Sequence, residues 1–197
     1  AGKFLGEPLD LQYSIVGANQ DAYYYAWAKT DTEQNFQVQL NFYEDKLWTP
    51  GKTEARAVHE VTEHLRRMNE WKKRIRQNKL HPFFGLTVVH GPESLVEEGS
   101  ALTLARLIPD IYDNLSPEGQ FQVDSDIFRH MVYANAHIFV NTEKKLDSEA
   151  VNGQVKDYIL HKMPWEDSNE LAKQIEWRRH DPNLQAYLLS YGLGAKL

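Results

Sequence analysis

Two pairs of adjacent ionisable residues, His59-Glu60 and Glu63-His64, lie close together in this chain. Imidazole nitrogens and carboxylate oxygens bind zinc in proteins, and they are the ligand types left here because the chain has no cysteine. A carboxylate beside such a metal can also take a proton from water. The cluster therefore indicates metal-dependent hydrolysis, provided that one helix presents both histidines to the same point.

The spacing of the two histidines opposes a shared metal in a regular α-helix. Because each helical residue turns by about 100°, His59 and His64 point about 140° away from each other. Measured against the apolar stripe from Val58 to Ile75, Glu60 and His64 flank the core, and His59 and Glu63 face solvent. A shared metal requires a bulge or break between the histidines. The alternative is a surface helix with His–Glu pairs four residues apart.

A second pair of carboxylates, Glu97 and Glu98, lies in the most apolar stretch of the chain, residues 94–108. Glu98 lies three residues after Leu95 and four before Leu102, on the predicted core stripe. A carboxylate is rarely buried without a cation, hydrogen-bond donors or a metal. We therefore expect at least one of the two inside the protein, with the positive N-terminus of the helix as the alternative partner for Glu97.

The elements that must position these side chains are mostly helical. Alternation from Asn35 to Phe42 predicts a strand with its apolar side chains on one face. The weaker strand candidates are residues 11–16, 22–27 and 85–89. Helical patterns cover residues 50–78, 92–108, 117–140, 147–163, 167–179 and 182–191. Gly192 and Gly194 are expected to end the last helix. The sequence predicts a mainly α (α+β) fold, a multi-helix domain with a small N-terminal β element, as a single domain over residues 1–197.

Composition and charge narrow the class of protein. The formal net charge of −6 argues against a nucleic-acid partner. No run of about 18 apolar residues predicts a membrane span, and no signal peptide is recognisable. We therefore expect a soluble protein that contacts neither nucleic acid nor membrane; its compartment is not fixed, with the cytoplasm favoured.

Two segments resemble motifs of a known group of proteins. Residues 57–61 (Ala-Val-His-Glu-Val) and 62–64 (Thr-Glu-His) are similar to the two flanks of His-Glu-x-Tyr-Pro-Gly-His-His followed by Thr-Glu-His. Residues 92–101 are similar to Pro-Glu-x-x-x-x-Glu-Gly-x-Ala. Over roughly residues 22–197 the chain resembles the C-terminal half of uncharacterised, mostly helical bacterial proteins, domains of unknown function regarded as gluzincin-type zinc peptidases. The Tyr-Pro-Gly-His-His segment is absent here, so one expected histidine is missing or displaced.

The resemblance implies a zinc-dependent hydrolase that cleaves peptide or small amide substrates. It implies three zinc ligands: His59, His64 and Glu98. Glu60 would be the general base, and Tyr187 or Tyr191 would stabilise the oxyanion.

The alternative hypothesis is a peptidase-like scaffold that has lost its metal and its activity. Such a protein would serve in binding or structure, as a homo-oligomer or with a partner chain. The shortened motif favours it, because one expected histidine is missing or displaced. If only His59 or His64 remains with Glu98, two ligands fall short of the three protein ligands of catalytic zinc.

Overall fold

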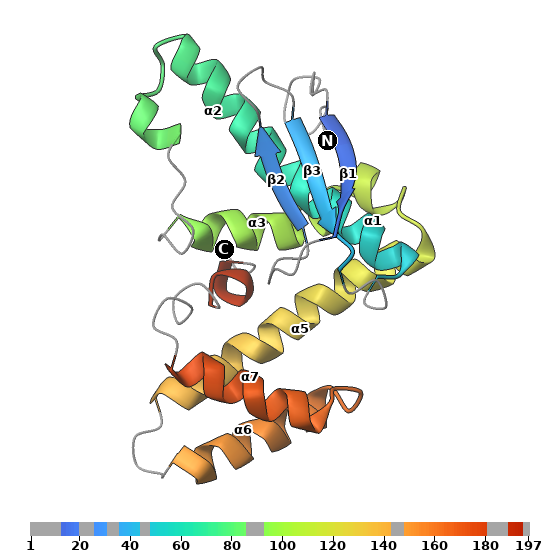
Figure 1. Ribbon diagram of the computed structural model, residues 1–197, viewed down its shortest axis with the longest axis vertical. Coiled ribbons are helices and arrows are strands. Elements are labelled where there is room, and N and C mark those ends of the chain that lie inside the picture. The colour runs from blue at the N-terminus through green and yellow to red at the C-terminus, as the bar shows by residue number, and fades with distance from the viewer. Residues whose placement is uncertain are drawn as a thin grey trace. The chain divides into compact units, whose positions relative to one another are not determined.

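The protein has a mainly α fold with a small N-terminal β element, as predicted (Figure 1). Its structure is a computed structural model that describes residues 13–19, 26–30, 36–43, 48–85, 93–142, 148–180 and 189–194. The strands are β1 (Tyr13–Ala18), β2 (Ala26–Thr30) and β3 (Phe36–Asn41). The helices are α1 (Pro50–His59), η2 (Glu60–Leu65), α2 (Arg66–Arg76), η3 (Pro82–Gly85), α3 (Ser94–Leu107), α4 (Pro109–Tyr112), α5 (Pro117–Thr142), α6 (Ser148–Lys162) and α7 (Ser168–His180).

The chain forms two compact units. Unit 1 comprises Ala1–Thr87 and Ala101–Asp124, and unit 2 comprises Val88–Ser100 and Ser125–Leu197. The helices α3 and α5 each contribute one end to unit 1 and the other to unit 2. That these units make up a single domain stays a prediction.

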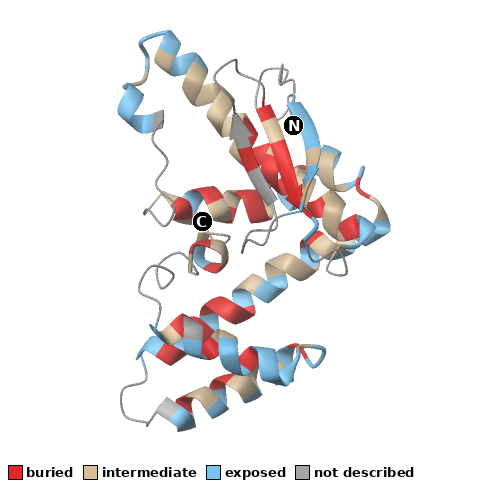
Figure 2. Cartoon of the chain, in the orientation of Figure 1, coloured by how far each residue is buried: buried red, intermediate tan, exposed pale blue. Residues whose placement is uncertain are grey.

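Unit 1 contains the sheet, whose strand order is β1-β3-β2. The central strand β3 pairs in parallel with β1 and antiparallel with β2, so that Val38 lies opposite both Ile15 and Ala28. Phe36, Val38 and Leu40 are buried, which confirms the face predicted from the alternating pattern (Figure 2). Their neighbour Phe42 is exposed, because the strand ends at Asn41.

The core of unit 1 lies between this sheet and the helix that carries the histidine cluster. Leu65, at the end of η2, is fully buried with the β3 side chains, and Val61 and Met68 pack against the same cluster. Apolar burial of this kind contributes about 1.5–3 kcal/mol for a side chain the size of leucine. It fixes the rotation of η2 and therefore the direction of the residues beside Leu65.

A second surface of the same helix is covered by the residues that lead into α5. Gly51 lies against the backbone of Glu118, where a β-carbon would collide. The carboxylate of Glu54 accepts hydrogen bonds from the backbone N–H of Ser116, at 3.1 Å, and from its hydroxyl, at 2.5 Å. Ser116 Oγ in turn accepts the N–H of Gly119 at 3.0 Å and so caps α5. The helix is therefore buried on two sides.

Unit 2 has its own core, built by α5, α6 and α7. The members with least exposure include Val151, Ile159, Met163 and Leu171, all of them fully buried. The buried core residues recur every four residues along α6 and α7 and at three- and four-residue intervals in α5, which is the spacing of a single buried face. The predicted boundaries of these three helices agree with the structure to within two residues.

Unit 2 also contains a close glycine contact. Gly99 on α3 lies against the backbone of Gly194, and Gly192 lies against the carbonyl of His130 and Cβ of Ala134. The expectation that Gly192 ends the last helix is wrong, because residues 189–194 are helical. The described part of this helix ends at Gly194. These glycines act through their missing side chains, which let two helices approach closely.

Some predicted elements lie outside the described residues. They are most of the strand at 22–27, most of the strand at 85–89 and most of the helix at 182–191. Among the helices that the structure does describe, none has the length and apolarity needed to cross a membrane.

Candidate metal centre

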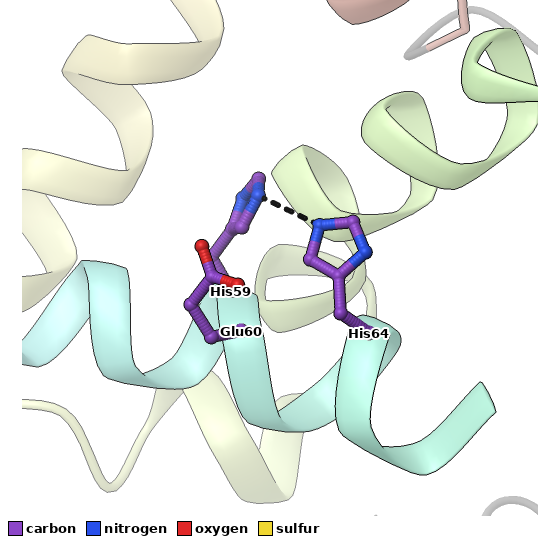
Figure 3. Close-up of side chains that lie close together, drawn as sticks. All are labelled: His59, Glu60 and His64. Atoms are coloured by element: carbon purple, nitrogen blue, oxygen red, sulfur yellow. Dashed lines mark hydrogen bonds between the residues drawn. The ribbon is translucent and has the colours of Figure 1, made fainter. Parts of the chain in front are cut away.

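The helix that carries the histidine cluster changes its winding at Glu60. The α-helix α1 ends at His59, and η2 is a π-helix of six residues before α2 begins at Arg66. Backbone hydrogen bonds in a π-helix join residues five apart rather than four, so residues five apart lie above one another. His59 and His64 have this spacing, and a nitrogen of each ring points toward the other ring, with the ring planes tilted by 56° (Figure 3).

The two imidazoles are in direct contact. Nε2 of His59 lies 3.4 Å from Nε2 of His64, and the ring centroids are 5.2 Å apart. In the absence of a metal, one Nε2 carries a hydrogen and donates it to the other. Two imidazole nitrogens on one tetrahedral zinc, each bound at 2.0–2.1 Å, would lie about 3.3 Å apart. The observed separation therefore suits a shared metal as well as a hydrogen bond.

Glu60 completes a group of three possible ligands. One of its carboxylate oxygens and one ring nitrogen of each histidine lie within 4.8 Å of one another. Among the described residues, this is the group of three histidine or carboxylate side chains whose ligand atoms all lie within that distance of one another. His59 and Glu60 are each 7% exposed, and His64 is half-buried. The carboxylate of Glu60 lies beside the His59 ring (Figure 3).

Side chains from within the same helix stabilise the π-helical turn. The hydroxyl of Thr62 donates to the carbonyl of Val58 at 2.7 Å, and Nε of Arg66 donates to the carbonyl of Thr62 at 2.9 Å. Side-chain donors of this kind compete with the regular backbone ladder of an α-helix. Together with the buried Leu65, they hold the wider turn in place.

The solvent-facing positions predicted for His59 and Glu63 are wrong, because both side chains are buried. The prediction assumed a regular helix with one buried face, whereas this helix is π-helical at the cluster and covered on two sides. The Glu63 carboxylate accepts a hydrogen bond from Nη2 of Arg66 at 2.9 Å and another from Nη2 of Arg67. Two guanidinium groups therefore compensate the charge of this buried carboxylate, and Glu63 stabilises the helix.

The carboxylates of α3 belong to unit 2 and differ in burial. The expectation that at least one lies inside is confirmed, since Glu97 is buried. Glu98, the predicted zinc ligand, is half-buried, although its Oε2 atom is shielded from solvent. Glu97 is the more buried because it lies four residues before Ala101 and eight before Ala105, on the core stripe of α3. The role of Glu98 as a zinc ligand stays a prediction.

Of the two tyrosines predicted to stabilise an oxyanion, Tyr187 lies outside the described residues. Tyr191, in unit 2, is half-buried, and its ring stacks on that of His130 with centroids 4.5 Å apart and planes 15° from parallel. Sequence reasoning missed this pairing, since residues 61 positions apart carry no local signal of contact. A catalytic role for Tyr191 stays a prediction.

Comparison of the chain with protein-family models, with curated proteins and with solved structures found no match. The functional assignment must therefore be argued from the geometry of the His59, Glu60 and His64 group.

Proposed function

We propose that the protein is a zinc-dependent hydrolase of peptide or amide bonds, with its metal centre at His59 and His64. The observation that carries the proposal is the π-helical turn, which cancels the divergence of the two histidines and places both Nε2 atoms 3.4 Å apart. π-Helical turns within α-helices occur often at functional sites. The chain resembles gluzincin-type proteins at these same residues, which supports the same class of reaction.

The donor set suits zinc. Imidazole and carboxylate are its ligands in proteins without metal-binding cysteines, and His₂Glu is an established catalytic combination. Burial of His59 and Glu60 strengthens each electrostatic interaction with a cation, because little water screens it. A bound zinc would supply a Lewis acid that activates water and polarises the scissile carbonyl.

The roles of the side chains follow from their positions. His59 and His64 would hold the metal through their Nε2 atoms. Glu60 accepts the proton of the attacking water at its carboxylate and passes it to the leaving amine. The third protein ligand would be Glu98, as the resemblance implies.

A metal-free binding or structural protein is the second candidate, and one observation favours it. His59 and His64 can satisfy each other through their hydrogen bond, so the turn can persist without a cation. Such a protein would retain the peptidase-like scaffold and bind a partner chain or a second copy of itself.

Glu60→Gln separates the proton-transfer role from metal binding. We expect the untagged wild-type protein, purified without chelator, to contain about one zinc per chain by plasma mass spectrometry and to cleave members of a peptide library. Glu60→Gln should keep the zinc and lose at least about 100-fold in kcat/KM, because general-base catalysis contributes about that much. Glu98→Gln should lose zinc if Glu98 is the third ligand.

The matched control is Glu70→Gln, which removes an exposed carboxylate of α2 that pairs with Arg74 at 2.6 Å. Its zinc content and activity should equal those of the wild type. A protein that stays free of metal after incubation with zinc would exclude the hydrolase and leave the binding protein. An unimpaired Glu60→Gln enzyme would remove Glu60 from the reaction.

A further inference from the structure

A second charged cluster surrounds the ring of Tyr133 in unit 2. The Tyr133 hydroxyl donates to Oε2 of Glu166 at 3.1 Å, and Nη2 of Arg129 donates to the same oxygen at 3.2 Å. The guanidinium carbon of Arg178 lies 4.4 Å from the Tyr133 ring centroid, and that of Arg129 lies 5.6 Å from it. Two guanidinium groups thus lie over the ring of Tyr133, and one carboxylate accepts a hydrogen bond from its hydroxyl.

Arg178 is the unusual member, because it is a cation only 9% exposed. Within the described part of the chain, no carboxylate forms an ion pair with it, and its buried Nε donates no hydrogen bond. Glu166 pairs with Arg129 instead. Burial lowers the pKa of Arg178 to about 10, opposed by Tyr133 and reinforced by the charge of Arg129. The guanidinium therefore remains charged at neutral pH.

A buried cation without a counter-charge is strongly unfavourable. Contact with the Tyr133 ring offsets only part of this cost, because a cation–π contact replaces little of the lost hydration. Arg129, whose side chain is 47% exposed, offers a second guanidinium that is partly open to solvent. The charges of Glu166 and Asp126 both act on Arg129, whereas no carboxylate of the described residues forms an ion pair with Arg178. The positive charge of Arg178 is therefore left for an oxyanion, whose oxygens match the planar donors of a guanidinium.

We propose that Arg178 and Arg129 bind an oxyanion, a carboxylate or phosphate group, at the surface of the unit 2 helices. Arg178 supplies the buried charge and Arg129 the exposed contact. Glu166 fixes Arg129 and Tyr133 in place. This site shares no residue with the proposed zinc centre, because none of the four residues is a predicted zinc ligand.

The test is a comparison of melting temperatures in chloride, phosphate and acetate at equal ionic strength. Each oxyanion is added at about 10 mM, too dilute for general salt stabilisation. A ligand that binds only the folded protein raises its melting temperature, by roughly 3 °C for a dissociation constant near 1 mM. We expect this rise in the wild type and its loss in Arg178→Met. A rise with phosphate alone assigns a phosphate group, and a rise with acetate assigns a carboxylate.

Arg179→Met is the matched control, because it removes the same charge from the next position of α7 and should keep the full rise. Arg178→Lys provides a second variant that retains the charge, so it folds even if the methionine variant does not. It should lose at least half of the rise, because an ammonium group lacks the planar fork. No rise in the wild type, or the same rise in the wild type and both Arg178 variants, would overturn the proposal.

Discussion

Replacing either His59 or His64 by alanine is expected to lower the affinity for zinc by more than about 100-fold, since lesser changes around a metal already cost 10–100-fold. Each histidine contributes one Nε2 atom to the pair, and a single imidazole leaves too small a ligand set to hold the ion. Isothermal titration with zinc and the metal content of the purified variants measure the effect.

The same variants should also remove the response of stability to the metal. Zinc that binds only the folded state raises the melting temperature, and a chelator reverses that rise in the wild type. His161→Ala is the control, because His161 is an exposed histidine near the end of α6. Its affinity and its response to chelator should match those of the wild type. Tight zinc binding by His64→Ala would place the metal centre elsewhere in the chain.

Gly99→Ala is expected to destabilise the protein by about 1–3 kcal/mol, the usual cost of forcing extra atoms into a packed contact. A β-carbon at Gly99 would overlap the backbone of Gly194, and backbone cannot move aside as a flexible side chain can. The contact joins α3, which carries Glu98, to the helical segment that carries Tyr191. Urea denaturation measures the change as a lower transition midpoint.

Gly153→Ala is the control, because it is expected to raise the free energy of unfolding where Gly99→Ala lowers it. Gly153 lies inside α6, is exposed, and has no atom within 4 Å of the position of an added β-carbon. Alanine there should stabilise the protein by about 0.5–1 kcal/mol, because glycine is the poorer helix former. If Gly99→Ala and Gly153→Ala changed the urea transition midpoint equally and only slightly, Gly99 and Gly194 would not pack together in solution.

Much of the fold follows from local pattern. The alternation around Val38 identified the buried face of β3, and three- and four-residue spacing located α5, α6 and α7. These signals are reliable because each element needs only one apolar face to find a partner. The alternating pattern carried the strand to Phe42, whereas the strand ends at Asn41. Where a strand ends depends on tertiary contacts such as that of the Phe42 ring with Trp48, whose centroids are 5.2 Å apart.

The candidate site could be predicted only in part. The residue types of His59, Glu60 and His64 suggested a metal, but regular helix geometry separated the histidines. The turn that unites them depends on Leu65 meeting the sheet and on Thr62 and Arg66 bonding to carbonyls, which are consequences of tertiary packing. Burial of Arg178 had no sequence signal either, since charged residues on a helix usually face solvent.

The π-helical turn also means that the sequence of this helix differs from the zinc-binding motif His-Glu-x-x-His by one inserted residue. A π-helical turn accommodates one residue more than the α-helical turn that it replaces. Deleting Thr62, whose hydroxyl serves the turn itself, would leave His59-Glu60-Val61-Glu63-His64. That string has the pattern His-Glu-x-x-His, in which a regular α-helix offers both histidines to one zinc. We expect the shortened protein to bind zinc while losing the π-helix, so that a single insertion or deletion, rather than any substitution, separates the two forms of the site.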